Sequence, residues 1–525
     1  MELVKVVSSQ QMYEIDQRTI CEFGTVGHEL MQRAGRAVVE AIAARWDGLA
    51  GLRVVVVCGK GNNGGDGYVV ARLLNQNAAQ VDLFLAAERA AVGGDAADHL
   101  FETEQAGVRV NELSDCGFEA LDRAIVECDL VVDALLGIGL RGAPRDIAAL
   151  IIDRINDSGR PVVAVDIPSG VEADTGVTLG KTVRAMVTVT FGLPKVGHLL
   201  FPGKACCGAL HLVDIGFAEP ALEDVQPVAY LLERDAMNSL LPRRSGDVHK
   251  GSCGTVGVVA GSVGMTGAAA LTAEAALRVG TGRVSLGIPE SLNDILEVKL
   301  TEVMTRPLPE VRRHRCLSLR ALGQVEQLCE QIDVLALGPG LGRHRETAEL
   351  VRRIARRCRS PLVLDADGLN ACAGRDDLLI SRSEETILTP HVGEFARLSG
   401  YTREDILVSP IELSRTYAAE NGVVLVLKGA PSVIASPDGS VMINPTGNAG
   451  MATAGAGDVL TGLIAGFWAQ GMLAVWAASL AVYLHGLAGD RARDRLSEWG
   501  LMAGDLLTEV PTALLDLARP QRGST

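Results

Sequence analysis

Short, fully apolar runs alternate along this chain with loops rich in glycine and aspartate, and this alternation constrains the fold most. The runs LRVVVVCG (52–59), VDLFLAA (81–87) and GTVGVVAGS (254–262) show little polar alternation. Strands with this pattern are buried on both faces, as in a parallel sheet covered by helices. Apolar residues at helical spacing lie between such runs, for example in GYVVARLLNQ (67–76). The alternation predicts an α/β fold with mainly parallel sheets.

The pattern occurs in two series, which predicts two domains. Residues 216–247 carry three prolines, several acids and no clear strand run, so we place the junction there. The predicted domains span 1–220 and 235–520. We expect helices over 11–21, 29–45 and 266–278, and further strands within 128–137, 161–170, 183–192, 334–342, 361–370, 385–394 and 423–436.

Composition excludes several classes of function. The net charge is −15, from 49 basic and 64 acidic side chains, with no long basic stripe, so we expect no nucleic-acid partner. Eleven cysteines without a C-x-x-C pair, and an N-terminus without an apolar signal core, indicate a reducing, cytoplasmic location. The apolar stretch 459–487 is broken by Gly and Gln, so we expect two buried helices and no membrane partner. We also expect a homo-oligomer.

The loop GKGNNGGDG (59–67) follows a predicted strand and precedes a predicted helix. Its five glycines would let the backbone take positive φ and approach a ligand closely. The helix N-terminus that follows would offer free N–H groups to a phosphate. The loop differs from the ordinary Rossmann G-x-G-x-x-G and lacks the Lys-Ser/Thr ending of a P-loop. The alternative is an ordinary tight turn.

A second glycine-rich segment, GNAGMATAGAGD (447–458), leads into the apolar helical sequence VLTGLIAGF. Free N–H groups at about 455–458 would form an anion hole for a phosphoryl group, and Asp458 would take a proton from a hydroxyl. The arrangement resembles ribokinase-like enzymes, in which G-x-G-D has this role. The alternative is a helix with an aspartate N-cap.

Residues 9–215 resemble NAD(P)H-hydrate epimerase through LMQRAG (30–35), GNNGGDG (61–67), DALLGIGLRG (133–142), VDIPSG (165–170) and FGLPKVGH (191–198). The resemblance implies a Rossmann-like domain and a K⁺ site in which Asn63, Asp133 and Ser169 supply oxygen ligands. Asp166 is implied as a substrate contact and acid/base, and Lys195 is a second candidate acid. The implied substrate cradle is Asn62, Asn63, Gly64, Gly65 and Asp66, with the wrapping loop Gly137, Ile138, Gly139, Leu140, Arg141, Gly142 and Ala143.

Each catalytic or metal residue of this half also has a structural alternative. Asp133 would cap a helix, Asp166 would be a turn carboxylate, and Lys195 would be a solvated surface lysine. We expect His198 and His211 to be structural.

Residues 240–515 resemble ADP-dependent NAD(P)H-hydrate dehydratase, a ribokinase-like enzyme. The motifs are HKGSCGTVGVVAGS (249–262), MTGAAALTAEAALRVGTG (265–282), LGPGLG (337–342), DADGLN (365–370), TPHVGE (389–394), KGAPSVI (428–434) and GNAGMATAGAGDVLTG (447–462). The resemblance implies hydrate contacts at Ala268, Gly340, His391 and Asp458. It implies nucleotide contacts at Lys428, Gly429, Ala430, Pro431, Ser432 and Gly457.

Some assignments in this half stay open. Mg²⁺ is the expected charge partner of the phosphates, and Asp365 and Asp367 either serve it or shape their loop. His391 is a substrate contact or a structural histidine. Ala456 stands where Thr or Ser is common in the family, and Ser432 stands where Thr is common. Neither change removes a backbone hydrogen-bond donor.

Together the two resemblances imply a repair enzyme for hydrated NADH and NADPH (NADHX and NADPHX). The first domain would interconvert the R and S epimers at C6. The second would dehydrate the S epimer at the expense of ADP, giving NAD(P)H, AMP and phosphate. The rivals are a ribokinase-like small-molecule kinase fused to a nucleotide-binding regulatory domain, and an NAD(P)-sensing scaffold without catalysis. The choice between ADP and ATP comes from the resemblance alone.

Overall fold

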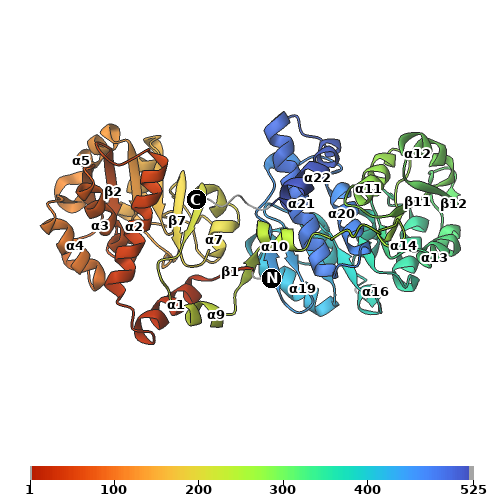
Figure 1. Cartoon of the computed structure of the whole chain (residues 1–525), viewed down its shortest axis with the longest axis horizontal. Helices are drawn as coiled ribbons and strands as arrows, with labels where there is room; N and C mark the ends of the chain where they lie inside the picture. Colours follow the sequence, from red (N-terminus) through yellow and green to blue (C-terminus); the bar gives the residue numbers. More distant parts are fainter. Residues whose placement is uncertain (1–2, 376, 520–525) are drawn as a thin grey trace. The chain divides into compact units, whose positions relative to one another are not determined.

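The computed structural model describes residues 3–375 and 377–519. The chain divides into two compact units, one over Lys5–Val228 and one that contains Ala229 and everything after it together with the first residues of the chain. Each unit has an α/β architecture (Figure 1), which confirms the expected fold class. None of the described helices is long and apolar enough to cross a membrane.

The first unit is built on a seven-stranded sheet in the order β4-β3-β2-β5-β6-β7-β8, in which all neighbouring strands are parallel. The chain runs outward from β2 in one direction and resumes at β5 in the other, so the strand order reverses between these two strands. The bounds are β2 (Arg53–Cys58), β3 (Gln80–Leu85), β4 (Val110–Glu112), β5 (Leu130–Ala134), β6 (Val162–Val165), β7 (Val187–Phe191) and β8 (Ala209–Val213).

Helices cover both faces of this sheet. Val54 and Val56 pack with α2, α3 and α4, whereas Val55 and Val57 pack with α5 and α6. All four valines are buried, as the apolar run predicts. The helices of the unit are α1 (Ser9–Cys21), α2 (Gly27–Arg45), α3 (Asn62–Gln76), α4 (Asp95–Gln105), α5 (Leu113–Glu127), α6 (Asp146–Asp157), α7 (Val196–Leu199), α8 (Gly203–Cys207) and α9 (Glu219–Asp224).

A second sheet has the order β1-β9-β20-β19-β18-β17-β16-β15-β10-β11-β12, in which β19 is antiparallel to both β18 and β20, and all its strands from β9 on belong to the second unit. Its strand order reverses between β10 and β15. The bounds are β1 (Val4–Val6), β9 (Ala229–Leu231), β10 (Thr255–Val259), β11 (Arg283–Pro289), β12 (Met304–Leu308), β15 (Val334–Leu337), β16 (Leu362–Leu364), β17 (Thr386–Leu388), β18 (Val424–Leu427), β19 (Val433–Ala435) and β20 (Val441–Ile443). A separate antiparallel pair is formed by β13 (Glu310–Val311) and β14 (Cys316–Leu317).

One face of this sheet is covered by α11, α20, α21 and α22, which share a core with Val256, Val258 and Ala336. α20 can approach α11 closely because Gly462 has no side chain: an ideal Cβ at this position would lie 2.1 Å from the Thr272 carbonyl oxygen. The helices are α10 (Arg234–Ser239), α11 (Thr266–Arg278), α12 (Asn293–Lys299), α13 (Leu322–Cys329), α14 (Arg345–Arg357), α15 (Asp367–Cys372), α16 (Asp377–Ile380), α17 (Val392–Ser399), α18 (Arg403–Val408), α19 (Pro410–Asn421), α20 (Ala456–Ala469), α21 (Ala474–Leu496) and α22 (Ala503–Ala518).

The structure differs from the sequence expectations at two places. The junction segment 216–247 contains the strand β9, which joins the second sheet beside β20. Three residues are too few to show a strand pattern. The helix expected from 67 begins at Asn62, so most of the glycine-rich loop is the first part of α3. Glycine has a low helix propensity, and tertiary packing overrides it here.

The glycines of this segment serve packing rather than unusual backbone angles. Gly59, Gly61, Gly64, Gly65 and Gly67 have no positive φ, contrary to expectation. An ideal Cβ on Gly64 would lie 1.9 Å from the Gly59 carbonyl oxygen. On Gly65 it would lie 2.4 Å from the Met31 sulfur, and on Gly67 it would lie 2.5 Å from Ala134 Cβ. The absent side chains therefore let the start of α3 lie directly against the ends of β2 and β5.

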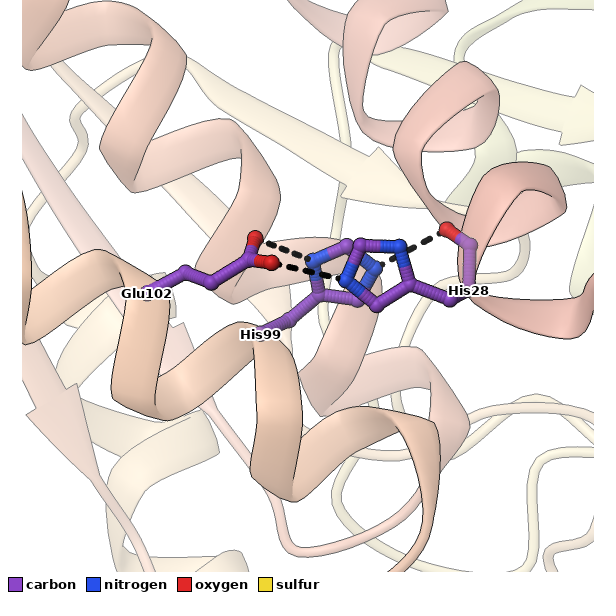
Figure 2. Close-up of side chains that lie close together, drawn as sticks. All are labelled: His28, His99 and Glu102. Carbon is purple, nitrogen blue, oxygen red and sulfur yellow. Dashed lines mark hydrogen bonds and ion pairs between the residues drawn. The ribbon is translucent and has the colours of Figure 1, made fainter.

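A polar cluster joins α2, α3 and α4 (Figure 2). Ligand atoms of His28, His99 and Glu102 lie within 4.8 Å of one another, a spacing compatible with a metal ion. However, the two rings are stacked with centroids 3.8 Å apart, so their in-plane lone pairs do not converge. The Arg72 guanidinium also pairs with Glu102. His28 Nε2 lies 2.9 Å from Glu102 Oε1, and His99 Nε2 lies 3.0 Å from the His28 carbonyl oxygen. The cluster is internally compensated and does not fit a metal.

Alanine substitutions at two glycines of the α3 turn should separate packing from backbone freedom. Gly64→Ala should lower the free energy of unfolding by about 2 kcal/mol or more, because the new methyl group would overlap the Gly59 carbonyl. Gly61→Ala should change it by less than about 1 kcal/mol, because nothing lies within 4 Å of its ideal Cβ and its φ is −93°. Chemical denaturation of the two variants checks this, and equal destabilisation would contradict the packing role.

Candidate active sites

In the first unit, the predicted metal residues meet where the strand order reverses, at the carboxyl ends of β2 and β5. Asp133 lies at the end of β5 and is fully buried. Its carboxylate accepts hydrogen bonds from the Ser169 hydroxyl at 2.6 Å and the Ser169 N–H at 2.8 Å. Leu136 N–H donates to Ser169 Oγ at 2.8 Å, and Asn63 Nδ2 donates to the Leu136 carbonyl at 3.0 Å. One hydrogen-bonded chain thus links Asn63, Ser169 and Asp133.

This group has the properties of a cation site. Asn63 Oδ1 is buried and has no hydrogen-bond partner among the described residues. Burial raises the pKa of Asp133 to about 6, although Ser169 and Leu135 oppose the shift by donating hydrogen bonds. An orphaned amide oxygen beside a buried carboxylate is a set of hard oxygen donors, which suits an alkali or alkaline-earth cation. Asp133 caps no helix, so that alternative is wrong.

The two predicted acid/base residues form a buried ion pair. Lys195, only 1% exposed, places its Nζ 2.7 Å from Asp166 Oδ1, so it is not a surface lysine. Thr190 donates to the same oxygen at 2.8 Å. Burial favours the neutral acid, but the charge of Lys195 and the hydrogen bonds from Lys195 and Thr190 outweigh it, and the pKa of Asp166 lies below its ordinary value. Asp166 is therefore a carboxylate next to an ammonium.

His198 holds the backbone of Asp166 in place. Asp166 has φ of 61°, a left-handed conformation that a non-glycine residue adopts only under constraint. His198 Nδ1 accepts from the Lys195 N–H at 3.1 Å, so Nε2 carries the proton and donates to the Asp166 carbonyl at 2.9 Å. Burial, followed by the charge of Lys195, lowers the pKa of His198 to about 4, which keeps the ring neutral. The expectation of a structural role fits this geometry.

The remaining predicted residues of this site lie on the first turns of α3 and on the loop after β5. Asp66, on the first turns of α3, is close enough that Asp166 and Asp16 add to burial in raising its pKa well above the ordinary value, against the effect of Lys195. The predicted wrapping loop, residues 137–143, connects β5 to α6 and is partly exposed. Arg141 on this loop is exposed. Two polar groups thus lie at the strand ends of this sheet. One is the chain of Asn63, Ser169 and Asp133, and the other is the ion pair of Asp166 and Lys195.

In the second unit, small residues line the reversal point between β10 and β15. Gly340, with φ of 63°, packs so closely that an ideal Cβ would lie 3.0 Å from Ala268 Cβ. Ser262 donates to the Gly340 carbonyl at 2.8 Å. Ligands of open α/β sheets bind in the crevice outside the strand ends at such reversal points. The structure thus brings the predicted hydrate contacts Ala268 and Gly340 together there.

Asp458 lies in the first turn of α20, which begins after Gly455 in a left-handed conformation with φ of 94°. The N-cap is Gly455, so Asp458 is not the cap, and that alternative is wrong. The N–H groups of a first helical turn have no acceptor within the helix and can bind an anion. Burial, followed by repulsion from Asp365, raises the pKa of Asp458 to about 7, with Lys428 opposing. This is a suitable value for a general base at neutral pH.

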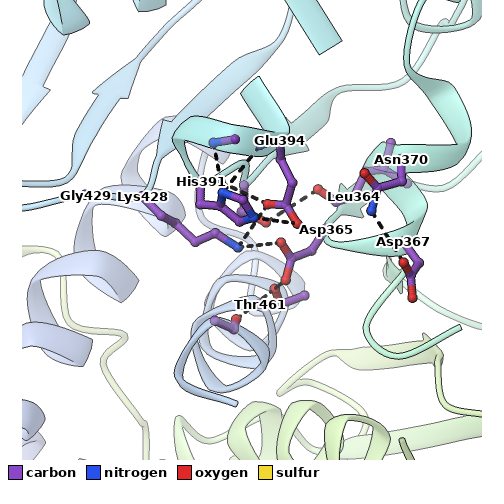
Figure 3. Close-up of polar contacts among 12 residues, drawn as sticks. Leu364, Asp365, Asp367, Asn370, His391, Glu394, Lys428, Gly429 and Thr461 are labelled. Atoms are coloured by element: carbon purple, nitrogen blue, oxygen red, sulfur yellow. Dashed lines mark hydrogen bonds and ion pairs between the residues drawn. The ribbon is translucent and has the colours of Figure 1, made fainter. Parts of the chain in front are cut away.

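A buried polar network surrounds this turn (Figure 3). Lys428 Nζ lies 2.7 Å from Asp365 Oδ1 and 3.9 Å from Glu394 Oε2. Thr461 donates to Asp365 Oδ2 at 2.7 Å. Burial lowers the pKa of Lys428, but Asp365 and Glu394 outweigh it, and the pKa is raised. The predicted nucleotide residue Lys428 is thus held as an ammonium beside the predicted base.

His391 serves a structural role as the N-cap of α17. Its Nδ1 caps α17 by accepting from the Gly393 N–H at 2.9 Å, while Glu394 accepts from the His391 N–H at 2.9 Å. Its side chain is nevertheless 53% exposed, so the ring is not a buried one. Asp367 accepts from the Gly342 N–H at 2.8 Å and shapes the loop after β15. The predicted nucleotide loop, residues 429–432, connects β18 to β19 and is partly exposed.

Three polar residues at these sites were not expected from their sequence motifs. Thr190 belongs to the apolar strand β7, Thr461 to the apolar helix α20, and Glu394 ends the motif TPHVGE without having been assigned a role. A hydroxyl buried in an otherwise apolar element needs a polar partner. Isolated threonines inside buried elements were the available signal.

Two protein-family models match the chain, one for each unit. Residues 27–197 match the family described as YjeF-related protein N-terminus. Residues 256–512 match the family described as NAD(P)H-hydrate dehydratase.

Several relatives align along nearly the whole chain. The bifunctional NAD(P)H-hydrate repair enzyme Nnr of Moorella thermoacetica is 44% identical, covering 98% of this chain and 97% of its own. The Nnr of Thermofilum pendens is 38% identical, covering 97% and 96%. A solved ADP/ATP-dependent NAD(P)H-hydrate dehydratase of Bacillus subtilis, co-crystallised with ATP and Mg²⁺, is 32% identical with a TM-score of 0.49, covering 54% of this chain and 97% of that one. The chain belongs to the family of bifunctional NAD(P)H-hydrate repair enzymes.

Proposed function

We propose that the chain repairs hydrated NADH and NADPH in two steps. The unit Lys5–Val228 interconverts the C6 epimers of the hydrate, and the unit that begins at Ala229 dehydrates the S epimer with ADP as phosphoryl donor. The observation that carries the proposal is the presence, in one chain, of a buried Asp166–Lys195 pair and of Asp458 at the glycine turn of α20. A dehydratase selective for one epimer needs an epimerase to use the other.

The geometry of the first site suits epimerisation of a carbinolamine. C6 of the hydrate carries both the hydroxyl and the bond to the ring nitrogen. Asp166 accepts the hydroxyl proton while the C6–N bond opens to an aldehyde, and Lys195 delivers a proton to the nitrogen. Reclosure on the other face returns both protons and gives the other epimer. Asp66, which lies close enough to Asp166 and Lys195 to feel their charges, would help to orient the substrate together with the loop 137–143.

We propose that Asn63, Asp133 and Ser169 hold K⁺ together with the Leu136 carbonyl. The orphaned Asn63 Oδ1 supports this assignment because a bound cation would give it a partner. Bound K⁺ would supply positive charge next to the start of α3, where a substrate phosphate would lie. The buried Asp133 would then remain ionised.

The geometry of the second site suits phosphoryl transfer. Asp458 takes the proton from the C6 hydroxyl, whose oxygen attacks the β-phosphorus of ADP, and AMP leaves. The first-turn N–H groups of α20 and the Lys428 ammonium stabilise the transferred group. The ring nitrogen then expels phosphate from C6, and loss of a C5 proton regenerates the dihydronicotinamide. Mg²⁺ would neutralise charge on the phosphates.

The proposal includes the cytoplasmic location and homo-oligomeric assembly expected from the sequence. All ten cysteines whose side chains the structure describes are free thiols, which supports a reducing compartment. Sedimentation of the purified chain would measure the oligomeric state.

Absorbance at 340 nm, the band of reduced nicotinamide, should separate the two activities. With a mixed-epimer NADPH hydrate, Mg²⁺, K⁺ and ADP, the unaltered chain should convert all the hydrate. With Asp166→Ala, the recovery of absorbance should stop once the S epimer is consumed. A sample without enzyme measures the spontaneous interconversion of the epimers. Asp458→Ala should convert none, because the hydroxyl keeps its proton.

Asp438→Asn, in an exposed turn outside both sites, serves as the control and should behave as the unaltered chain. ATP-dependent phosphorylation of a stable alcohol by the folded chain, without ADP-dependent recovery of absorbance, would instead favour the kinase. Tight binding without turnover would favour the sensing scaffold.

Removal of the orphaned oxygen should abolish the dependence of epimerisation on K⁺. Asn63→Ala should lower the epimerase rate at saturating K⁺ by about tenfold or more and leave it insensitive to K⁺. Asn75→Ala, on the same helix, removes a hydrogen bond to Ala106 away from the site and should keep the K⁺ response. The rate of epimer exchange, followed by NMR over a K⁺ titration against choline, measures the effect. A K⁺ response of Asn63→Ala equal to that of Asn75→Ala would refute the assignment.

A further inference from the structure

Both oxygens of the Asp365 carboxylate are engaged by donors of the protein. Asp365 follows β16, and its side chain is only 1% exposed. Oδ1 lies 2.7 Å from Lys428 Nζ, and Oδ2 accepts the Thr461 hydroxyl at 2.7 Å. Figure 3 shows the carboxylate between these two side chains, turned away from Asp367. Since both oxygens already have strong donors from the protein, Asp365 is poorly placed to bind Mg²⁺, one of the two roles left open by the sequence.

The Lys428 ammonium lies directly against the first turn of α20. An ideal Cβ on Gly457 would be 3.2 Å from Lys428 Nζ. The backbone of Lys428 is fixed by its N–H bond to the Pro390 carbonyl at 2.8 Å, so the side chain reaches the turn from a rigid strand end. This places a cation where the N–H groups of the turn already favour an anion.

Asp365 also joins this ammonium to the helix itself. Thr461 lies one turn after Gly457, and its Oγ1 is 2.7 Å from Asp365 Oδ2 and 3.1 Å from the Gly457 carbonyl. One carboxylate therefore connects the end of β16, the end of β18 and the first two turns of α20. If it is removed, a flexible lysine side chain loses its nearest fixed anchor.

We propose that Asp365 is a positioning residue for phosphoryl transfer: it fixes the Lys428 ammonium against the first turn of α20, beside the base Asp458. This inference rests on the proposed dehydratase function and assigns Asp365 a role without contact to the substrate. A misplacement of about 1 Å in a group that stabilises the transition state costs on the order of 100-fold in rate.

The charge of Asp365 gives this role a distinctive signature. Burial is the main cause that raises the pKa of Asp458 to about 7. Among the charged groups around it, Asp365 raises this pKa most, and Asp367 and Glu394 add smaller increases. The charge of Lys428 opposes them. His485 on α21 is near enough to feel the charge of Lys428 but stays neutral, because burial, followed in the same direction by that charge, lowers its pKa to about 4. Neutralising Asp365 removes a repulsion and frees Lys428 to approach Asp458. Both changes lower the pKa of Asp458.

A base acts when it is deprotonated, so kcat should rise with pH through the pKa of Asp458 and then level off. In Asp365→Asn we expect a fall of about 10-fold to 100-fold in the plateau kcat, because the ammonium is no longer fixed. The acidic limb of the profile should also move to lower pH by roughly 0.5–1 unit. The assay uses the full chain with NADPH hydrate, ADP and Mg²⁺.

Two variants separate charge from packing. Thr461→Val keeps the carboxylate and its ion pair but removes the hydroxyl, so the plateau should fall while the acidic limb stays in place. Asp438→Asn changes an equally sized side chain in the β19–β20 turn, outside the site, and should alter neither quantity. A purely structural role of Asp365 would lower the plateau without moving the limb.

Titration of ¹³Cγ-labelled aspartate by NMR, assigned with Asp458→Asn, measures the Asp458 carboxyl without any turnover. A downward shift in Asp365→Asn would support the proposal even if the substrate of the site were different. An unchanged titration and an unchanged plateau would overturn it. Absence of ADP-dependent turnover in the unaltered chain, with the NMR shift present, would reject the proposed function while leaving the Asp365–Lys428–Asp458 coupling established.

Discussion

A carboxylate buried at the end of a parallel strand must receive positive charge or hydrogen-bond donors, and both sites of this protein depend on that requirement. In the first unit, Asp166 is held by Lys195 at 2.7 Å and Thr190 at 2.8 Å. In the second, Asp365 is held by Lys428 and Thr461, each at 2.7 Å. Each unit thus places an aspartate, a lysine and a threonine from different elements at one sheet edge.

The same arrangement serves different chemistry in the two units. In the proposed function Asp166 is itself the reacting carboxylate, and its backbone is held in a strained conformation by a neutral histidine. Asp365 has no open face and acts through its neighbours, while Asp458, less tightly held, is the group whose pKa lies near neutrality. A cation lowers the pKa of Asp166, whereas burial, followed by a nearby anion, raises that of Asp458. The acid and base properties of the sites follow from these charges.

Close backbone packing sets the positions of these charges. Because Gly64, Gly65 and Gly67 have no side chains, α3 can pack directly against the ends of β2 and β5. Asn63 and Asp66 lie on this same part of α3. Gly462 does the same for α20 against α11, which fixes the turn carrying Asp458. The glycines lie at the strand ends, as expected, but the expected reason for them, positive φ, was wrong for the first motif. Steric contact between segments distant in sequence cannot be deduced from the motif itself.

The sequence by itself determined the two α/β units, the position of each site at strand ends and the residue types available there, because buried strands and glycine-rich loops have local patterns. It could not show that Lys195 is buried, that Asp365 is fully engaged or that His391 caps a helix. It also gave no sign of β9, which exists only through pairing with β20. Those properties were decided by the tertiary structure, since burial, hydrogen-bond partners and the resulting pKa values depend on which distant segments meet.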